Sequence, residues 1–295
     1  MRLVATNFYQ KLLSSEGCSK DIELKRHEVW ASIKPTVTFA MRTNLSKPFT
    51  SLEIEEALQA LPKNSCPGED GLSPEFYKNN WDLCKDALCA PFQEIMDTGV
   101  MPMEWNDGLI FLIPKGDGSS NEIQKGRPIT ILNTVYKLLA KIISLRLQPI
   151  LLQCIHGSQT GFLKERSILD NITTFWEATS EATKTRQNLA ILLLDFEKVY
   201  DRVEWSFLHG TLLRFGFDEQ WIRGVSALYS STSSKVLLAG GTGSSFPITR
   251  SVMQGCPLAP YLFLFFAEAM SSYLNHEDVG LRGLRIPPGP VPKIF

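Results

Sequence analysis

The sequence predicts an α+β protein, because two kinds of apolar pattern occur in separate parts of the chain. Long segments repeat apolar side chains with the period of an amphipathic helix. Short, mostly apolar runs bounded by turn residues are typical of strands buried in a sheet. We predict strands at 108–114, 128–132, 189–194, 235–238 and 246–252, with helices before, between and after them.

Composition limits the class of protein before any motif is considered. The chain has 295 residues, of which 44% are hydrophobic and 21% charged, as expected for a soluble protein with one large or two smaller domains. Its formal net charge is −1, so a nucleic acid would have to bind in a local groove. The six cysteines show no C-x-x-C spacing, which indicates reduced thiols and neither a zinc site nor a disulfide framework.

The sequence gives no reason to expect a membrane partner. The N-terminal apolar run is too short and too polar for a signal peptide. The most apolar segment, 258–270, is shorter than a bilayer span and contains Glu268, so we expect a core helix there. An intracellular protein is expected, and the choice between nucleus and cytoplasm stays open.

The N-terminal third is predicted to be helical. Residues 1–50 look like helical pieces with little chemistry. Thr50 opens a clearer helix with a capping box, and Pro62 ends it. Ser73, followed by a proline and an acid, starts the next helix, which we expect to carry Trp81.

A hairpin is predicted from the strands at 108–114 and 128–132. It would bring Lys115, near the end of one strand, close to Arg127, near the end of the other. At about 4 Å and an effective dielectric of about 20, two such cations repel by on the order of 4 kcal/mol, and a triphosphate between them reverses the sign. The alternative is that both point into water. The intervening glycines are not a P-loop, because no Gly-Lys-Ser/Thr opens a helix there.

Four further helices are predicted in the second half of the chain. A long amphipathic helix covers 133–153, and the loop 159–171 enters another helix. The remaining two are expected at 205–213 and 219–229.

Gln254 and Gly255 stand before the apolar C-terminal helix. Glycine lets a backbone approach something flat or bulky, and a glutamine beside it can hydrogen-bond a base or a sugar. The alternative is an ordinary loop that enters a core helix.

The stretch 189–203 carries the most specific chemistry. Its apolar run, predicted as a strand buried on both faces, ends at Asp195. A carboxylate at the tip of a buried strand is costly unless it is paired, and a divalent metal is the usual partner. Asp195 could instead cap the next helix, or serve as the nucleophile of a haloacid-dehalogenase-type phosphatase. That phosphatase needs a second aspartate two residues on, where this chain has Glu197.

Five motifs, in this order, resemble the reverse transcriptase of non-LTR (LINE-type) retrotransposons, especially the plant-like elements. They are CPGEDGLSPEFYK, LIPKGD with GRPITILNTVYKLLAKIISLRL, QTGFLKERSILDNI, LLLDFEKVYDRV and MQGCPLAPYLF. The resemblance extends from about Phe49 to about Leu274, which is most of the chain.

The resemblance implies a right-hand polymerase fold with fingers and a partial palm. It assigns 1–62 to an N-terminal helical extension, 63–188 mostly to the fingers, 189–275 to the partial palm and 276–295 to a proline-rich tail. A thumb is not expected in this chain.

The resemblance also implies a catalytic site. Asp195 looks like the first Mg²⁺-binding aspartate of the palm. Tyr200 looks like the aromatic gate whose ring excludes a ribose 2′-hydroxyl. Val199 departs from the family pattern, which usually has alanine beside the gate, and adds bulk in a tight place.

The incoming nucleotide has four further candidate contacts by this resemblance. Gln254 and Gly255 look like the contact with the templating base and the dNTP. Lys115 and Arg127 look like the fingers cations that meet the triphosphate. Met253 departs from the arginine that many members have before Gln-Gly.

A third group of residues looks like part of the template channel. Gly161, Phe162 and Arg166 match the corresponding family motif. The implied partners are an RNA template, a DNA primer and dNTPs.

One family motif has no counterpart in the sequence. The family completes its two-metal site with an aromatic-Ala-Asp-Asp tetrapeptide on a hairpin beside the central strand, and no such tetrapeptide occurs here. Glu277-Asp278 lies in a polar segment and is a poor substitute. We therefore expect an incomplete domain that holds Mg²⁺ weakly or not at all, does not polymerise alone, and leaves 190–195 as an unpaired edge. The alternatives are a non-catalytic nucleic-acid-binding remnant and, less favoured, the phosphatase that uses Asp195.

Overall fold

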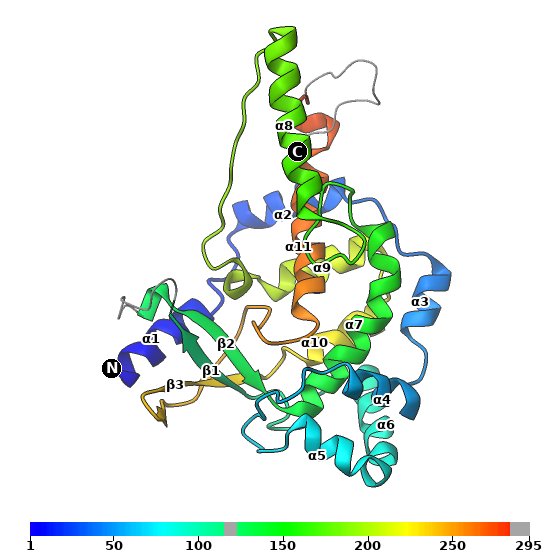
Figure 1. The fold of residues 1–295 in the computed structure, drawn as a ribbon, viewed down its shortest axis with the longest axis vertical. Coiled ribbons are helices and arrows are strands. Elements are labelled where there is room, and N and C mark those ends of the chain that lie inside the picture. The colour runs from blue at the N-terminus through cyan, green and yellow to red at the C-terminus, as the bar shows by residue number, and fades with distance from the viewer. Residues whose placement is uncertain (115–122, 284–295) are drawn as a thin grey trace.

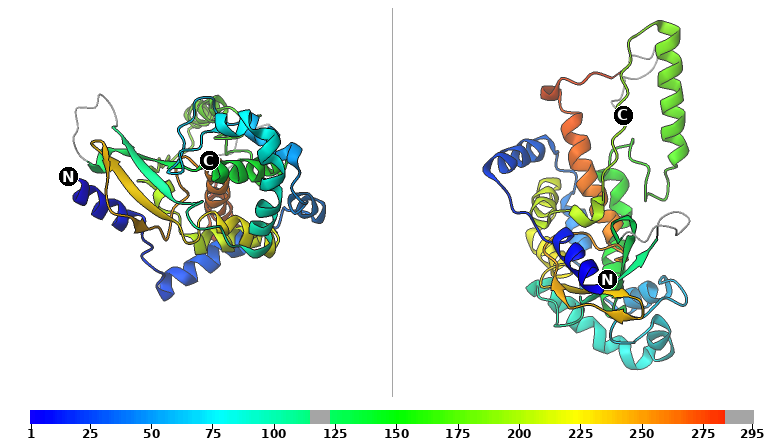
Figure 2. Two further views of the ribbon diagram at one scale, coloured as in Figure 1. Left: turned by 90° about the horizontal axis from the view of Figure 1, so that it is seen from below. Right: turned by 90° about the vertical axis from the view of Figure 1, so that its left-hand side faces the viewer.

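The computed structural model describes residues 1–114 and 123–283 and has the mixed α and β composition that the sequence predicts (Figure 1). Within those ranges the chain forms eleven α-helices and one five-stranded sheet. Most of the helices surround the long helix α7 (Thr134–Cys154), and the sheet lies to one side of it (Figure 1). Helix α8 (Ile168–Thr185) projects away from this body in Figure 1 and in the right-hand view of Figure 2.

The sheet is built on the predicted hairpin. Its strands are β1 (Gly108–Ile113), β2 (Arg127–Leu132), β3 (Ser233–Leu238), β4 (Gly241–Thr242) and β5 (Phe246–Pro247). β1 pairs with β2 in antiparallel fashion, with Ile113 opposite Arg127, and with β3 in parallel fashion. Ile110 and Val236, opposite each other on β1 and β3, are both buried. The hairpin therefore forms where the apolar runs predict it, and β3 covers the predicted strand at 235–238.

The N-terminal helices are part of the same body. They are α1 (Arg2–Leu12), α2 (Lys20–Ser32), α3 (Phe39–Leu45) and α4 (Ser51–Gln59). Thr50 caps α4 in a capping box with Glu53, as predicted. The guanidinium of Arg2 donates hydrogen bonds to the carbonyls of Leu238 and Ala239 at 3.0 Å, and Tyr9 is fully buried. Helix α1 is thereby attached to the end of β3.

The helix predicted from Ser73 onward is in fact two helices. Ser73 caps α5 (Pro74–Asn79), and α6 (Trp81–Thr98) starts directly afterwards. Asn80 between them has a φ of −116° and a ψ of 24°, so it breaks the helical path. Its side-chain amide donates to the carbonyl of Phe76 at 2.8 Å, the local bonding that favours asparagine at helix ends.

The remaining helices agree with the predicted positions. They are α9 (Trp205–Phe215), α10 (Glu219–Ala227) and α11 (Ala259–Leu274). α11 is the predicted core helix, and in the described ranges no helix is long and apolar enough to cross a membrane.

Two strand predictions are wrong in whole or in part. Residues 189–194 form no strand, and Leu192 and Leu193 are 79% and 84% exposed. A strand exists only with a hydrogen-bonded neighbour, and none of the described strands pairs with this run. The predicted strand 246–252 is a strand only at Phe246–Pro247, because the backbone beyond it bonds in turn to three separate segments rather than to one ladder.

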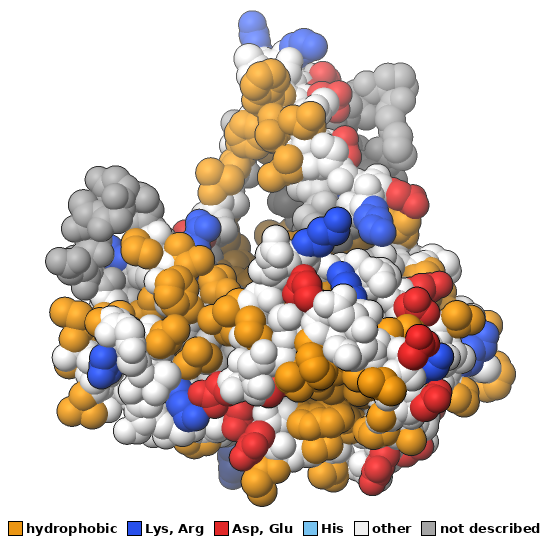
Figure 3. Space-filling model, turned by 60° about the horizontal axis from the view of Figure 1, so that its bottom comes forward, with side chains coloured by type: hydrophobic (Ala, Val, Ile, Leu, Met, Phe, Trp, Pro, Cys, Tyr) orange, Lys and Arg blue, Asp and Glu red, His pale blue; other side chains and the backbone are white. Residues whose placement is uncertain are grey.

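The projecting α8 and the extended segment that returns from it form an arm, residues 168–197. Only Ala182 of α8 is buried. The large apolar side chains of the arm are exposed: Ile168, Leu169, Ile172, Phe175, Trp176, Leu189, Ile191, Leu192, Leu193, Leu194 and Phe196. Hydrophobic side chains accordingly gather on the projection in the space-filling view (Figure 3). The described residues thus leave an apolar surface of the arm uncovered.

Candidate functional site

Three segments that the sequence analysis assigned to the nucleotide site meet in one place, which we call the junction. It consists of β2, the short helix η2 (Val199–Arg202) and the loop 251–256. Ser251 and Val252 donate backbone hydrogen bonds to the carbonyls of Val203 and Tyr200, at 2.8 and 3.0 Å. The backbone N–H of Thr130 in β2 donates to the carbonyl of Gln254 at 2.6 Å. The loop is therefore bonded to both of the other segments.

Gly255 is required by the closeness of this contact. Its φ is +122°, a conformation that side chains rarely adopt. A Cβ at this position would lie 2.2 Å from the carbonyl oxygen of Thr130. The backbone that approaches Gly255 closely is that of β2, whereas the approach of a flat or bulky ligand stays a prediction.

Tyr200 lies flat on α11. Its ring stacks on that of Phe263, with centroids 4.6 Å apart and planes inclined by 22°. The side chain is half-buried, and burial raises the pKa of its hydroxyl to about 12. The ring is therefore a fixed, neutral part of the junction.

Asp201 belongs to the junction but was missed by the sequence analysis. Its side chain is 3% exposed, and its Oδ1 accepts a hydrogen bond from Nε2 of Gln254 at 3.2 Å. Its Oδ2 is buried without a hydrogen-bond partner among the described residues. Burial raises the pKa of this carboxyl to about 6, against the opposing effect of the nearby cations. No pattern in the local sequence signals this burial, because Asp201 lies on a polar turn.

Asp195 stands apart from this network. It lies on the exposed return segment of the arm, and its carboxylate makes no hydrogen bond or ion pair within the described ranges. The prediction that it ends a strand buried on both faces is wrong, because the strand itself does not form. Among the described residues, no three His, Cys, Asp or Glu side chains are grouped so as to hold a metal ion. These residues therefore do not fit a Mg²⁺ site.

Of the two predicted fingers cations, the structure describes Arg127. Arg127 is exposed at the start of β2, the strand that also carries Thr130 of the junction. Lys115 lies outside the described residues. β1 ends at Ile113, opposite Arg127, so the hairpin brings the end of β1 to the start of β2.

The predicted template residues lie together in the loop before α8. Phe162 has a φ of +61° and is 59% exposed, and a Cβ on Gly161 would meet no atom within 4 Å. The guanidinium of Arg166 donates to the carbonyls of Ile155, His156 and Gln159. Arg166 thus holds the loop in shape while Phe162 faces outward.

A hollow of about 230 Å³ adjoins this loop. Phe162 and Leu163 line it together with Gln148 and Tyr261, whose hydroxyl accepts a hydrogen bond from Gln148 at 2.6 Å. The loop and the body therefore form a shallow groove beside the exposed ring.

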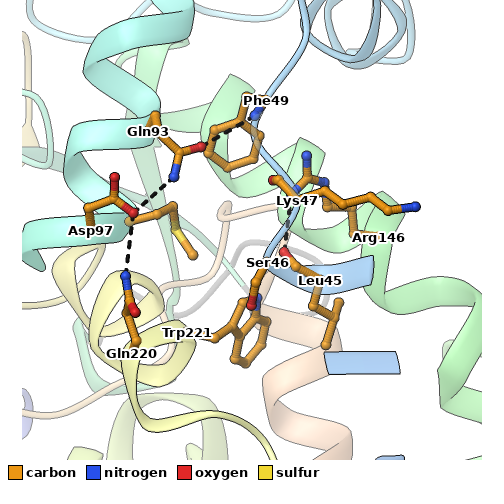
Figure 4. Close-up of a pocket in the computed structure, with 10 residues that line it drawn as sticks. Leu45, Ser46, Lys47, Phe49, Gln93, Asp97, Arg146, Gln220 and Trp221 are labelled. Atoms are coloured by element: carbon orange, nitrogen blue, oxygen red, sulfur yellow. Dashed lines mark hydrogen bonds between the residues drawn. The ribbon is translucent and has the colours of Figure 1, made fainter. Parts of the chain in front are cut away.

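A second hollow, of about 150 Å³, lies where several helices pack against the segment before α4 (Figure 4). Arg146 of α7 lines one side of this hollow, where it donates to three backbone carbonyls before α4. Its guanidinium also forms a bidentate ion pair with Glu53 and lies 4.5 Å from the centroid of the Phe49 ring. On the other side, Gln93 and Gln220 both donate to Asp97. These polar groups are satisfied by each other, so this hollow is not the candidate site.

Comparison with known proteins identifies the family to which these motifs belong. Residues 113–281 match the family described as reverse transcriptase (RNA-dependent DNA polymerase). The chain is also 33% identical, over 277 residues and 94% of its length, to the transposon TX1 uncharacterized 149 kDa protein of Xenopus laevis. The chain belongs to the reverse transcriptase family. The predicted resemblance to reverse transcriptases of non-LTR retrotransposons is confirmed.

Other relatives are more distant reverse transcriptases of mobile elements. The chain is 28% identical over 74% of its length to the Pol polyprotein of a type-1 retrotransposable element R2 from Popillia japonica. It is 25% identical over 80% of its length to the RNA-directed DNA polymerase of the mobile element jockey from Drosophila melanogaster. The chain spans 21% of the length of the TX1 protein, 29% of the R2 polyprotein and 27% of the jockey polymerase. The chain therefore spans less than a third of each of these relatives.

Proposed function

We propose that this reverse transcriptase chain binds a primer–template and an incoming dNTP at the junction. The observation that carries the proposal is the meeting of β2, η2 and the loop 251–256, which are distant in sequence and include Tyr200 and Gln254. A site built from three separate chain segments is what a nucleotide pocket needs, because the base, sugar and phosphates must be met from different sides.

We assign the triphosphate to the hairpin. Arg127 is exposed at the start of β2, three residues before Thr130, whose backbone bonds Gln254. Arginine pairs with phosphate oxygens through two parallel hydrogen bonds. Lys115, the second predicted cation, is proposed as its partner across the hairpin.

We assign to Tyr200 the discrimination against nucleotides that carry a ribose 2′-hydroxyl. Stacking on Phe263 fixes the ring, so that it cannot swing aside to admit a 2′-hydroxyl. Val199 beside it narrows the same space relative to the alanine of the family pattern.

We assign the template to the loop that carries Phe162. Stacking of a nucleobase on an exposed aromatic ring contributes about 1–3 kcal/mol per base, without regard to sequence. Phe162 is exposed, and Gly161 beside it leaves open space for a strand to pass. Arg166 maintains the loop through its three carbonyl contacts.

We also propose the domain boundaries that the family resemblance implies. We propose that 1–62 is an N-terminal extension, 63–188 mostly fingers, 189–275 part of the palm and 276–295 a tail. Helix α1 of the extension is attached to the end of β3, which lies in the same sheet as β2 of the junction.

We propose that catalysis needs carboxylates beyond those described here. Reverse transcriptases generally work with divalent ions such as Mg²⁺, and the described residues do not fit such an ion. Within 1–114 and 123–283, no strand pairs with the run 189–195, and its leucine and isoleucine side chains are exposed. A further hairpin that paired with this run would bury its apolar side chains and bring acidic groups to Asp195.

Primer extension tests the catalytic part of this proposal. The chain is mixed with an RNA template, a DNA primer, dNTPs and Mg²⁺, alongside the Asp195→Ala variant. We expect no extension by either protein. Extension by the wild-type chain that is lost in Asp195→Ala would show that the chain holds a complete catalytic site, which would contradict this proposal.

A second candidate function is a non-catalytic nucleic-acid binder of the same family. The absence of a metal-binding cluster among the described residues favours it. Such a binder should have an RNA affinity that falls as the salt concentration rises, because contacts with the RNA phosphates release counterions. Its RNA affinity should not change when dNTPs are added.

A further inference from the structure

The contact between Asp201 and Gln254 determines which end of the Gln254 amide is free. A buried, ionised carboxylate can only accept hydrogen bonds, so the amide –NH₂ must face it. Within the described ranges, no protein group donates to the other end of the amide, Oε1, and the side chain is only partly buried. The free end of Gln254 is therefore a hydrogen-bond acceptor.

The backbones on both sides of this contact are fixed. The N–H of Asp201 donates to the carbonyl of Lys198, the residue before η2, at 2.9 Å, and the carbonyl of Tyr200 in η2 accepts from the N–H of Val252. The carbonyl of Gln254 accepts from Thr130 of β2. Neither residue can move away to relax the contact, so the orientation of the amide follows from the charge state of the carboxyl.

We propose that Asp201 is the positioning residue of Gln254, and that it makes the junction select a ligand group that donates a hydrogen bond, such as a hydroxyl or a base N–H. This role deepens the proposed nucleotide site and rests on it for the identity of the ligand. It goes beyond the family match, which assigns nothing to Asp201 in this chain. A buried Oδ2 without a partner fits this role, because an unsatisfied carboxylate is costly and is unexpected in a purely structural contact.

The groups that face Asp201 make this orientation depend on pH. Lys198 just before η2, Arg202 of η2 and Arg250 just before the loop 251–256 favour the ionised form of Asp201, whereas burial opposes it. The negative charge of Asp201 also acts on the hydroxyl of Tyr9 on α1, whose pKa it helps to raise. The net result is a carboxyl pKa of about 6. Above that pH the carboxylate imposes one amide orientation. Below it the neutral carboxyl can donate as well as accept, and the amide is free to flip.

Nuclear magnetic resonance of the Gln254 side-chain –NH₂ group tests the positioning role without any ligand. The full chain is titrated from pH 5 to pH 8, and the signal is assigned by its loss in Gln254→Leu. We expect the two amide protons to shift together with a midpoint near pH 6 in the wild type. The shift should be absent in Asp201→Asn, whose side chain can both donate and accept at every pH.

The matched control is Asp218→Asn. Asp218 is exposed and caps α10 through its Oδ1, a task that asparagine performs equally well. This variant should leave the Gln254 titration unchanged. A Gln254 signal that does not titrate in the wild type, or that titrates equally in Asp201→Asn, would overturn the proposal; the wild-type titration decides even if the variant fails to fold.

Binding of a dNTP to the chain–primer–template complex tests the consequence. Asp201→Asn should weaken dNTP binding on the order of tenfold at pH 7.5, as expected when the accepting end of the amide is no longer held in place. Wild-type affinity should also fall as the pH is lowered through about 6. If the Gln254 signal titrates as expected but the wild type binds no dNTP, the nucleotide function fails while the positioning role of Asp201 stands. Equal dNTP affinity of wild type and Asp201→Asn would remove the role in ligand selection.

Discussion

Gly255 and Thr130 approach each other so closely that any side chain at position 255 would collide with the Thr130 carbonyl. The hypothetical Cβ lies 2.2 Å from that oxygen, and the glycine has a φ of +122°. This contact joins the loop that carries Gln254 to the strand that carries Arg127. The geometry of the junction therefore depends on the absence of one methyl group.

Gly255→Ala should destabilise the protein. Both the strained φ and the collision must be relieved by a backbone shift, which costs on the order of 2–4 kcal/mol. Urea unfolding measures the loss. Gly157→Ala is the control, because Gly157 has no strained φ and a Cβ there meets no atom within 4 Å. Equal stability of the two variants would contradict the close approach.

Arg146→Lys should also destabilise the protein, although it keeps the positive charge. The guanidinium of Arg146 donates hydrogen bonds to three backbone carbonyls and to both carboxylate oxygens of Glu53, and it lies over the ring of Phe49. A lysine ammonium lacks the planar, branched set of donors that these contacts need. We expect a loss of about 2–3 kcal/mol in the free energy of unfolding. Arg214→Lys, at an exposed position in the last turn of α9, should change stability by less than about 0.5 kcal/mol.

Glu268→Gln should change how stability depends on pH. Glu268 of α11 is buried and accepts a hydrogen bond from the backbone of His156 at 3.0 Å, and burial raises its carboxyl pKa to about 7. A raised acid pKa means that the folded state holds the proton more tightly than the unfolded chain. The stability that this contributes is complete below the ordinary glutamate pKa and is lost as the pH rises through about 7.

The variant cannot ionise, so it should gain on the wild type between pH 4.5 and pH 8, by about 3 kcal/mol at most. Unfolding by urea at a series of pH values measures this difference. Glu28→Gln, at an exposed position of α2, should show no such trend. A constant difference between Glu268→Gln and wild type would show that the Glu268 carboxyl is not desolvated.

Charges placed on the arm should be tolerated. Leu192 and Leu193 are almost fully exposed, so Leu192→Lys combined with Leu193→Lys should change the free energy of unfolding by less than about 0.5 kcal/mol per site. The same change should reduce self-association in sedimentation experiments, because exposed apolar runs with unpaired backbone groups promote aggregation. Leu138→Lys, in the fully buried part of α7, should unfold the protein. Unfolding of the Leu192/Leu193 variant would instead show that the run is a buried strand.

The sequence predicts those features that depend on near neighbours in the chain. The capping box of Thr50 and Glu53 and the Ser73–Pro74 helix start are complete within one helical turn, so local residues suffice to specify them. The hairpin β1–β2 is predicted for a similar reason, because its two strands are close in sequence and both mostly apolar.

Features that depend on distant segments are not predicted. The run 189–194 has the composition of a buried strand, but a strand also needs a neighbour, which none of the described segments supplies. Asp201 looks like an ordinary polar turn residue, and its burial depends on α1 and on the loop of Gln254, which come from opposite ends of the chain. The family motifs indicate which segments form the site, while Asp195, Tyr200, Gln254 and the other assigned residues stay proposals for their individual roles.

The most direct test of the central claim is the effect of a dNTP on primer–template binding. Fluorescence anisotropy of a labelled RNA–DNA primer–template is measured at several salt concentrations, with the dNTP complementary to the next template base or with a mismatched one. We predict that binding weakens with salt, that only the complementary dNTP strengthens it, and that Arg127→Ala removes this strengthening. Equal binding with both dNTPs, or an unchanged dNTP effect in Arg127→Ala, would contradict a nucleotide site at the junction.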